Sequence, residues 1–442
     1  MIQINNGVLI CNNERFEIHD DKTNIYDLLA EKRNENMFFG ANEENYSFLD
    51  TCPLTYVLNF EVDKALLKKD IIRLKFDYID TYAKIILNGQ EIAQTKNAFR
   101  SYEFDVKKFL KKGTNELIVE IEPIYQKWQA VNSDDFNILH SEKRAVFRKA
   151  AFQFGWDWAP RQLAGEISFP ICLTFEDEKE YLRFASVQTE AISEEVANML
   201  LTIKTEFLKD EKYNLKLAYS TSDNRITILD LGELSLENSK DNLSLFRFNV
   251  ENPQLWFPNG YGDPTLYEAT IYLYNKKSIC LDSVKTRFGI RTIELSQKKD
   301  KYGSEFCFIV NGKPIFAKGA NLVPSAMHKE KYEGMAKHID LVKECNMNML
   351  RVWGGGYYVD EQMYKACDEK GILIWQDFPF ACALYPATKD YLAEVETEAR
   401  QNVLRISSHP SLAVWCGNNE IWEGWGNWSW DKEVKDTALA VK

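Results

Sequence analysis

The hydrophobic periodicity of this chain changes part-way along it, and 442 residues are too many for one ordinary hydrophobic core, so we expect two to four domains. In the first part apolar residues alternate with polar ones, as at Ile72, Leu74 and Phe76. A period of two places alternate side chains on one face of a β-strand. The Asn88-Gly89 pair, which follows a later apolar run, is typical of a tight hairpin turn. We therefore predict that residues 1–180 form a β-sandwich with a jelly-roll arrangement of strands.

The alternation continues in shorter units between residues 181 and 286. One such unit contains Leu215, Leu217 and Tyr219. Short alternating strands over about 100 residues are typical of an immunoglobulin-like β-sandwich. The charged and polar stretch 176–181 marks the boundary that we expect between the two sandwiches.

Residues 287–442 follow a different pattern, in which short apolar runs alternate with amphipathic helical stretches. This order is typical of a parallel sheet covered by helices. A helix that begins near Asp360 is expected to end at Gly371, because Gly readily adopts the left-handed conformation that stops a helix. Another predicted helix buries the stripe Leu392, Val395, Ala399 and Val403. The predicted strands are 315–323, 349–353, 372–376 and 412–416. A closed (β/α)8 TIM barrel needs eight such units over about 250 residues, so we expect an incomplete barrel.

The charge of the chain excludes nucleic acid as an expected partner. The formal net charge of the 442 residues is -12, and an acidic surface repels phosphate backbones. The segment MIQINNGVLI lacks the basic start and apolar core of a secretory signal, and no apolar stretch approaches the roughly 20 residues of a membrane-spanning helix. The nine cysteines show no CxxC or Cys/His spacing, so we expect neither a disulfide framework nor a metal site. These features favour a cytoplasmic location.

Polar, aromatic and acidic residues follow the predicted strands of the last domain, where a β/α barrel builds its active site. Glu420 follows the fourth strand in the sequence Gly-Asn-Asn-Glu, with Trp415, Trp422, Trp425 and Trp428 nearby. Aromatic surroundings raise the pKa of a carboxyl group, so that it stays protonated and acts as a general acid. Cleavage of a glycosidic bond needs such an acid and a second carboxylate. The structural alternative is that Glu420 only caps a helix.

The segment HPSLAVWCGNNE, residues 409–420, resembles the acid/base motif of glycoside hydrolase family 2, and its NNE ending resembles the β-mannosidase branch. The segments RVWGGGYY, GILIWQDFPFACALYP, FGIRTIEL and PQLWFPNGYGDPTLY resemble the same branch. So does the order of jelly roll, immunoglobulin-like sandwich and TIM barrel. The resemblance implies a retaining exo-β-mannosidase that hydrolyses terminal non-reducing β-D-mannose residues of β-mannosides or manno-oligosaccharides. It implies Glu420 as the acid/base and no cofactor.

Another motif lies in the predicted jelly roll. The segment FQFGWDWAP, residues 152–160, resembles a β-mannosidase loop whose Trp and Asp meet the terminal sugar, and Trp156 and Asp157 match those positions. The structural alternative is an aromatic cluster that holds the domain boundary. One departure is Ala159, where the resemblance leads us to expect Gly. A methyl group there alters the loop if its backbone needs a positive φ, which Gly tolerates best.

The same resemblance implies further contacts with the sugar. Asn419 is expected to hydrogen-bond the 2-hydroxyl, a contact that strengthens in the transition state. Arg351 is expected to orient nearby carboxylates, and Asp377 to fix sugar hydroxyls. Trp353 and Trp428 are expected to form walls of the sugar pocket. The structural alternatives are that Arg351 pairs with Asp377 as part of the barrel, and that Trp353 belongs to the core.

The nucleophile that a retaining mechanism requires is not identified in the sequence. In this family it follows a later barrel strand, whereas none of the acidic residues after Glu420 ends an apolar run. We therefore expect the chain to be truncated within the barrel and inactive by itself. Two alternatives stay open: another family 2 enzyme, such as a β-galactosidase or β-glucuronidase, and a non-catalytic carbohydrate-binding fragment.

Overall fold

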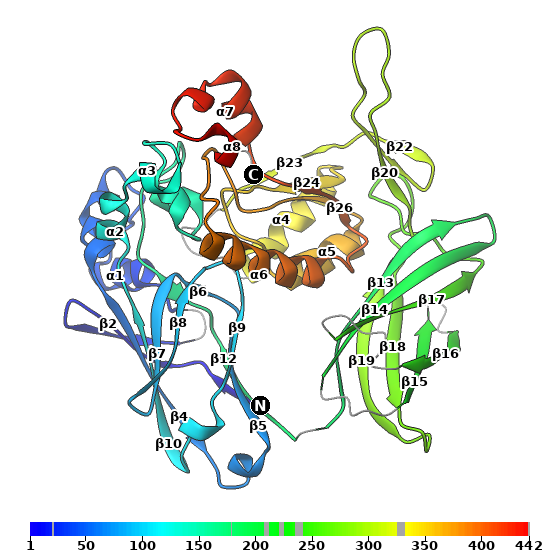
Figure 1. Cartoon of the computed structure of the whole chain (residues 1–442), viewed down its shortest axis with the longest axis horizontal. Coiled ribbons are helices and arrows are strands. Elements are labelled where there is room, and N and C mark those ends of the chain that lie inside the picture. Colours follow the sequence, from blue (N-terminus) through cyan, green and yellow to red (C-terminus); the bar gives the residue numbers. More distant parts are fainter. Residues whose placement is uncertain are drawn as a thin grey trace.

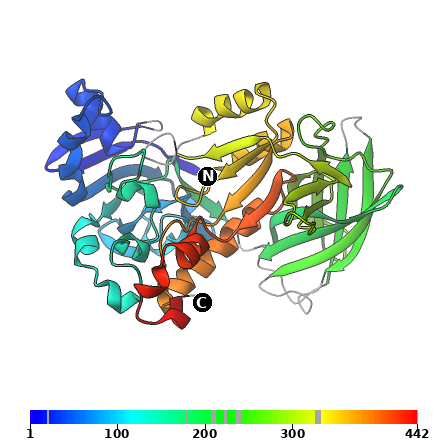
Figure 2. The ribbon, with the colours of Figure 1, turned by 90° about the horizontal axis from the view of Figure 1, so that it is seen from above.

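The computed structural model describes residues 1–19, 22–177, 179–206, 212–220, 225–234, 242–324 and 332–440. Two β-sandwiches flank a parallel sheet with its helices. In Figure 1 the first sandwich is blue to cyan, the second is green, and the parallel sheet with its helices is yellow to red. Viewed from above in Figure 2, the yellow-to-red segments again lie between the blue and green ones. Of the described helices, none combines the length and apolar character needed to cross a lipid bilayer.

The first body, here called the N-terminal sandwich, packs a four-stranded sheet against a six-stranded one. The four-stranded sheet has the order β1 (Ile2–Ile4), β12 (Ile171–Glu176), β5 (Ile71–Phe76) and β9 (Tyr102–Asp105). The six-stranded sheet has the order β3 (Glu14–Ile18), β2 (Gly7–Cys11), β4 (Leu54–Val62), β10 (Gly113–Ile121), β7 (Tyr82–Leu87) and β8 (Gln90–Lys96). The predicted alternation is confirmed, because Ile72, Leu74 and Phe76 are buried while their neighbours Arg73 and Lys75 are half-buried.

Shorter elements complete the N-terminal sandwich. A two-stranded sheet joins β6 (Ile79–Asp80) to β11 (Glu166–Ile167), and the helices are α1 (Ile25–Arg33), α2 (Tyr125–Ala130) and α3 (Ser133–Phe136). The turn between β7 and β8 lies at Asn88-Gly89, where both residues have positive φ. This is the geometry that the twist of a two-residue hairpin requires.

The second sandwich pairs a three-stranded with a four-stranded antiparallel sheet. The first sheet has the order β13 (Tyr181–Ile192), β14 (Val196–Glu206) and β17 (Leu243–Glu251). The second has the order β16 (Ile226–Leu234), β15 (Tyr213–Ser220), β18 (Tyr267–Tyr274) and β19 (Cys280–Phe288). Leu215, Leu217 and Tyr219 face the core between the sheets. The last strand ends at Phe288 rather than at residue 286.

A small antiparallel sheet of β20 (Ile293–Ser296), β21 (Cys307–Val310) and β22 (Lys313–Ile315) leads into a parallel one. The parallel strands, in spatial order, are β23 (Gly319–Leu322), β24 (Met349–Val352), β25 (Leu373–Asp377) and β26 (Leu412–Cys416). The helices are α4 (Tyr332–Glu344), α5 (Glu361–Lys370), α6 (Lys389–Ile406), α7 (Ile421–Asn427) and α8 (Thr437–Ala440). As predicted, Asp360 caps the start of α5 and Gly371 ends it in the left-handed conformation.

Two details of the predicted pattern are wrong. The run 315–323 is not one strand, because β22 ends at Ile315 and a separate parallel strand begins at Gly319. The backbones of β23 and β24 approach so closely at Gly319 that an added Cβ would lie 1.8 Å from the carbonyl oxygen of Met349. The buried side of α6 is not the predicted apolar stripe either, since Leu392 is exposed whereas Glu398 and Asn402 are buried.

The reason for the second error is that α6 packs against polar groups of the N-terminal sandwich. The guanidinium of Arg148 donates to both carboxylate oxygens of Glu398, at 2.6 and 2.9 Å. Asn97 Nδ2 donates to Glu398 at 3.0 Å, and Asn402 Nδ2 donates to the carbonyl of Phe99 at 2.9 Å. These hydrogen bonds fix the N-terminal sandwich against the parallel sheet.

Candidate active site

Four neighbouring parallel strands bring polar side chains together at their carboxyl ends. Arg351 on β24 donates to both carboxylate oxygens of Asp377 on β25, at 2.6 and 3.2 Å. The same guanidinium donates to the side-chain oxygens of Asn419 at 2.8 Å and of Asn321 at 3.2 Å. One arginine therefore joins the ends of all four strands. The predicted neighbourhood of Arg351, Asp377 and Asn419 is present, and so is the alternative in which Arg351 pairs with Asp377.

Asp377 lies beneath this cluster rather than on its surface. Burial raises the pKa of its carboxyl group, and Arg351 opposes this effect together with the N–H of Gly354 and the indole of Trp375. The Gly354 N–H donates to Oδ2 at 3.0 Å and Trp375 Nε1 donates to Oδ1 at 2.9 Å. With both oxygens already hydrogen-bonded and only 1% of the residue exposed, Asp377 holds Arg351 and the backbone in place. We find no free carboxylate oxygen there to fix a sugar hydroxyl.

Asn419 and Glu420 follow β26 and end up in different environments. Asn419 is buried, and its Nδ2 donates to the sulfur of Cys382 at 3.2 Å. Glu420 is exposed at the rim, where its Oε2 accepts from the same thiol at 3.1 Å. Glu420 occupies the position before α7, with a φ of 62°, but its side chain makes no capping hydrogen bond. Instead Asn418 Oδ1 accepts from the N–H of Ile421 at 3.1 Å, so the helix-capping alternative for Glu420 is wrong.

The expected aromatic surroundings of Glu420 are open. Trp422 and Trp428 are 67% and 45% exposed, and the ring of Trp428 contacts that of Trp430 edge-on. Trp415 stacks on Phe378 instead. Among the contacts of the described residues, none joins Trp428 to the Arg351 cluster, so its role as a wall of the sugar pocket stays a prediction.

The loop 152–160 of the N-terminal sandwich reaches the parallel sheet. The rings of Trp156 and Trp353 meet edge-on with centroids 5.0 Å apart, and Trp158 also packs edge-on against Trp353. Trp353 is buried, as the core alternative predicted. Phe152 donates its N–H to the carbonyl of Gly355 at 3.2 Å. The predicted aromatic cluster at the domain boundary is therefore present.

Asp157 lies at the tip of this loop. The N–H groups and carbonyls of Trp156 and Ala159 bond reciprocally, at 2.9 and 3.2 Å, and close a tight turn. Asp157 is exposed in this turn, with no side-chain hydrogen bond to the described residues. Ala159 is buried and is not among the residues with positive φ. Its methyl group therefore fits the turn without strain.

Sequence reasoning missed two residues that join these parts. Cys382 bridges Asn419 and Glu420, as described above. Arg144 of the N-terminal sandwich donates to the carbonyls of Ala381 and Cys382 at 3.0 and 3.1 Å, and its guanidinium lies 5.1 Å from the ring of Trp156. Cys382 is part of a motif segment that was recognised, so its position after the third strand was a usable signal. Nothing in the local sequence of Arg144 indicates its role.

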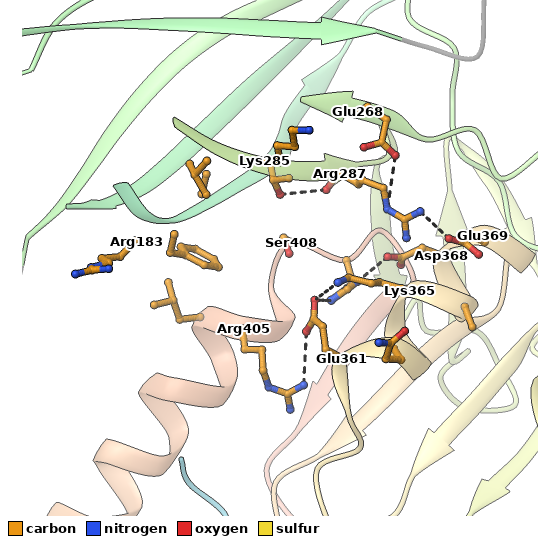
Figure 3. Close-up of a pocket in the computed structure, with 18 of the residues that line it drawn as sticks. Arg183, Glu268, Lys285, Arg287, Glu361, Lys365, Asp368, Glu369, Arg405 and Ser408 are labelled. Carbon is orange, nitrogen blue, oxygen red and sulfur yellow. Dashed lines mark hydrogen bonds and ion pairs between the residues drawn. The ribbon is translucent and has the colours of Figure 1, made fainter. Parts of the chain in front are cut away.

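A cavity of about 790 Å³ lies elsewhere, between the second sandwich and helices α5 and α6 (Figure 3). Its charged groups face one another: Arg287 contacts Glu369 at 2.6 Å, while Arg405 and Lys365 contact Glu361 at 3.7 and 3.8 Å. These five side chains are therefore already paired with one another. We therefore place the candidate active site at the strand ends. In the ranges that the structure describes, no group of three His, Cys, Asp or Glu side chains suits a metal ion.

Comparisons with known proteins find matches along most of the chain. Residues 13–165 match the family described as glycosyl hydrolase 2 galactose-binding domain-like, and residues 181–291 match glycosyl hydrolases family 2. Proteins named β-mannosidase B from Aspergillus flavus and Aspergillus fumigatus are 32% and 33% identical to this chain over 411 and 414 residues. These alignments cover 90% of this chain and 47% of each relative, so the chain spans about half the length of the curated relatives it matches.

Solved structures show the same relationship. A β-D-mannosidase from Dictyoglomus thermophilum is 31% identical, with a TM-score of 0.85 over 97% of this chain and 53% of that protein. An exo-chitosanase from Amycolatopsis orientalis shares the fold at 16% identity, with a TM-score of 0.70 over 94% of this chain and 49% of that protein. The two family matches, the β-mannosidase relatives and the fold shared with the Dictyoglomus thermophilum enzyme lead to one conclusion: this chain belongs to glycoside hydrolase family 2.

Proposed function

We propose that this chain provides the acid/base side of a retaining exo-β-mannosidase, which hydrolyses terminal non-reducing β-D-mannose residues. The observation that carries the proposal is the strand-end cluster, in which Glu420 is exposed beside the fixed pair Asn419 and Arg351. Relatives named β-mannosidases support the choice of sugar. We also propose that the four parallel strands are the first half of a TIM barrel, since active sites of that fold lie at the carboxyl ends of its strands.

In this mechanism Glu420 protonates the leaving glycosidic oxygen and later takes a proton from the attacking water. An exposed carboxyl at the rim reaches the leaving group, whereas the buried Asp377 does not. Asn419 contacts the 2-hydroxyl, and the loop with Trp156 and Asp157 bounds the terminal sugar. A second carboxylate acts as nucleophile at roughly 5–5.5 Å from the acid/base. We assign that role to no residue of this chain, and we propose that the chain alone does not turn over substrate.

A panel of aryl glycosides tests the choice of sugar. The protein is produced as this chain extended to the full length of its relatives, and the aryl β-mannoside, β-galactoside, β-glucuronide and β-glucosaminide are compared by kcat/KM. We expect the mannoside to be preferred. Preferential cleavage of another glycoside would move the protein to a different family 2 activity, because those enzymes share the fold and the acid/base.

A second candidate function is carbohydrate binding without catalysis. The observation in its favour is the set of exposed rings near the strand ends, namely Trp158, Trp422 and Trp428, because indole faces pack well on sugars. Calorimetry of the 442-residue chain with mannobiose, combined with an assay for released mannose, separates the two functions. Binding that persists without hydrolysis in the extended protein as well would favour this candidate.

A further inference from the structure

Cys382 lies at the centre of the candidate site although its thiol has no part in the chemistry proposed above. It follows β25, in the loop that precedes α6. Its sulfur is 3.2 Å from Asn419 Nδ2 and 3.1 Å from Glu420 Oε2. The thiol is thus a link between the residue expected to bind the sugar and the residue expected to act as acid/base.

The backbone around Cys382 is held from two directions. Its N–H donates to the carbonyl of Asn419 at 3.0 Å, and the N–H of Asn419 donates to the carbonyl of Phe380 at 2.8 Å. From the N-terminal sandwich, the buried Arg144 donates to the carbonyls of Ala381 and Cys382. The sulfur therefore stays in one place relative to β26. A thiol on a free loop would make no such fixed contact.

We propose that Cys382 is a positioning residue for the acid/base: its S–H donates to the carboxylate of Glu420 while its sulfur accepts from Asn419. The proposal rests on the proposed function, in which Glu420 transfers the proton. The first contact limits the rotation of an exposed carboxyl group that has no capping contact with α7. The second contact directs the amide oxygen of Asn419 toward Arg351, where it accepts at 2.8 Å.

The thiol of Cys382 carries the proton that a hydrogen-bond donor needs. Burial raises the pKa of Cys382 to about 12, and the hydrogen bond and charge of Glu420 act in the same direction, against a smaller opposing effect of Asn419. The sulfur therefore keeps its proton at neutral pH. Because S–H is a weak donor, the bond restrains the carboxylate yet breaks readily when Glu420 turns toward the leaving oxygen. Serine in its place would donate a stronger bond, and alanine would donate none.

Infrared spectroscopy tests the contact on the 442-residue chain without any substrate. The S–H stretching band lies in a spectral window free of other protein bands, and the difference between wild type and Cys382→Ala isolates the band of this thiol. We expect that band to move to higher frequency in Glu420→Ala, because the hydrogen bond to the carboxylate is lost. A band that stays at the same frequency in Glu420→Ala would overturn the proposal, whatever the enzyme cleaves.

Kinetics test the consequence in the protein extended to the length of its relatives. We expect Cys382→Ala to lower kcat on the order of tenfold with little change in KM. Cys382→Ser should restore kcat. Cys280→Ala, which removes an exposed thiol of the second sandwich, should change neither kcat nor KM.

The possible results of these experiments distinguish a failure of the proposed function from a failure of the proposed role of Cys382. If another glycoside is preferred, the same variants are compared on that substrate, and only the choice of sugar is lost. If no glycoside is cleaved, the proposed function fails and the infrared band alone decides the contact. Equal losses of kcat in Cys382→Ala and Cys382→Ser would show that Cys382 only fills space.

Discussion

Both ends of the Asn419 side-chain amide are hydrogen-bonded before any sugar arrives. Its oxygen accepts from Arg351 and its nitrogen donates to Cys382. An amide oxygen has a second lone pair and an amide nitrogen a second hydrogen, so a sugar hydroxyl can add to either end without breaking these contacts. At the scale of single residues, the site is therefore oriented in advance, which reduces the entropy lost on binding.

The first prediction concerns the proton donor. In the extended protein, Glu420→Gln should reduce kcat/KM on the order of a hundredfold or more for alkyl mannosides and manno-oligosaccharides. Activated aryl mannosides should lose far less, because their leaving groups need little protonation. Kinetics on the two substrate types measure the difference. Equal losses on both would remove Glu420 from the acid role.

The second prediction concerns Asp157, which is exposed and makes no side-chain hydrogen bond within the described chain. Asp157→Ala should leave the melting temperature unchanged but lower kcat/KM for the mannoside roughly 10–100-fold, as expected when a polar partner of the sugar is lost. Asp157→Asn keeps the shape of the side chain and serves as the matched variant. A lowered melting temperature with unchanged kinetics would instead assign Asp157 to the structure of the loop.

At the scale of elements, α6 packs against two different parts of the molecule. One side belongs to the layer that covers the parallel sheet, while Glu398 and Asn402 face the N-terminal sandwich and are buried. A buried carboxylate is tolerated only when it is paired and hydrogen-bonded. Arg148, Asn97 and the hydroxyl of Tyr358 supply these partners. The helix therefore transmits the position of the sandwich to the sheet.

The third prediction tests this contact. Glu398→Ala should lower the free energy of unfolding by about 3–5 kcal/mol, because the buried guanidinium of Arg148 loses its counter-charge. Glu396→Ala on the same helix is the control, since Glu396 pairs with Arg400 where both side chains are largely exposed, and it should change stability by less than about 1 kcal/mol. Urea unfolding followed by tryptophan fluorescence measures both. Similar effects for the two variants would contradict the role of the buried pair.

The fourth prediction concerns the contact between α5 and the start of β26. Burial lowers the pKa of His409, but contacts with Asp368 at 2.6 Å and Glu361 at 3.2 Å outweigh it and raise the pKa to about 9. A raised folded-state pKa gives stability that is fully present below the unfolded value of about 6.5. This stability, up to about 3 kcal/mol, should be lost as pH rises through about 9.

Urea midpoints between about pH 6 and 10 measure this dependence. The informative quantity is the difference between wild type and His409→Gln, because it cancels the contributions of other groups. That difference should shrink as pH rises. A difference that stays constant with pH would show that the ring packs beside Tyr364 without contributing as a charged group.

At the scale of the whole molecule, one surface loop can be cleaved while the two parts of the chain that it connects stay bound to each other. The segment 297–306 between β20 and β21 is exposed throughout and contains Lys298, Lys299 and Lys301. Figure 1 shows it as a long projection away from the rest of the molecule. The parts on either side of it are joined elsewhere, because Arg148 binds Glu398 and the side chain of Arg291 donates to the carbonyls of Pro410 and Leu412.

The fifth prediction follows from this arrangement. Brief trypsin treatment should cut after Lys299 or Lys301, and the two fragments should elute together in size-exclusion chromatography. Denaturing electrophoresis of the same peak should show both. In Glu398→Ala the fragments should separate more readily, because one of the contacts that hold them is lost. Immediate separation of the wild-type fragments would show that the covalent connection, rather than the interface, holds the domains.

The sequence by itself determined the local elements and which residues lie together at the site. The alternation in β5, the turn at Asn88-Gly89 and the ends of α5 follow from short-range rules, so these elements were predictable. Arg351, Asp377 and Asn419 were also predictable as neighbours. Each lies at or just beyond the carboxyl end of a parallel strand, and the carboxyl ends of parallel strands share one edge of the sheet.

Only the tertiary structure decided the contacts between segments that are far apart in the sequence. Two such contacts are the close approach of β24 at Gly319 and the burial of Glu398 against Arg148, some 250 residues earlier. Arg144 likewise reaches the site only once the N-terminal sandwich meets the end of β25, and Cys382 contacts Asn419 and Glu420 only once β25 and β26 are neighbours. Periodicity reports which face of an element is buried against apolar neighbours. It carries no information about a polar partner that a distant segment supplies, and such partners set the geometry of this site.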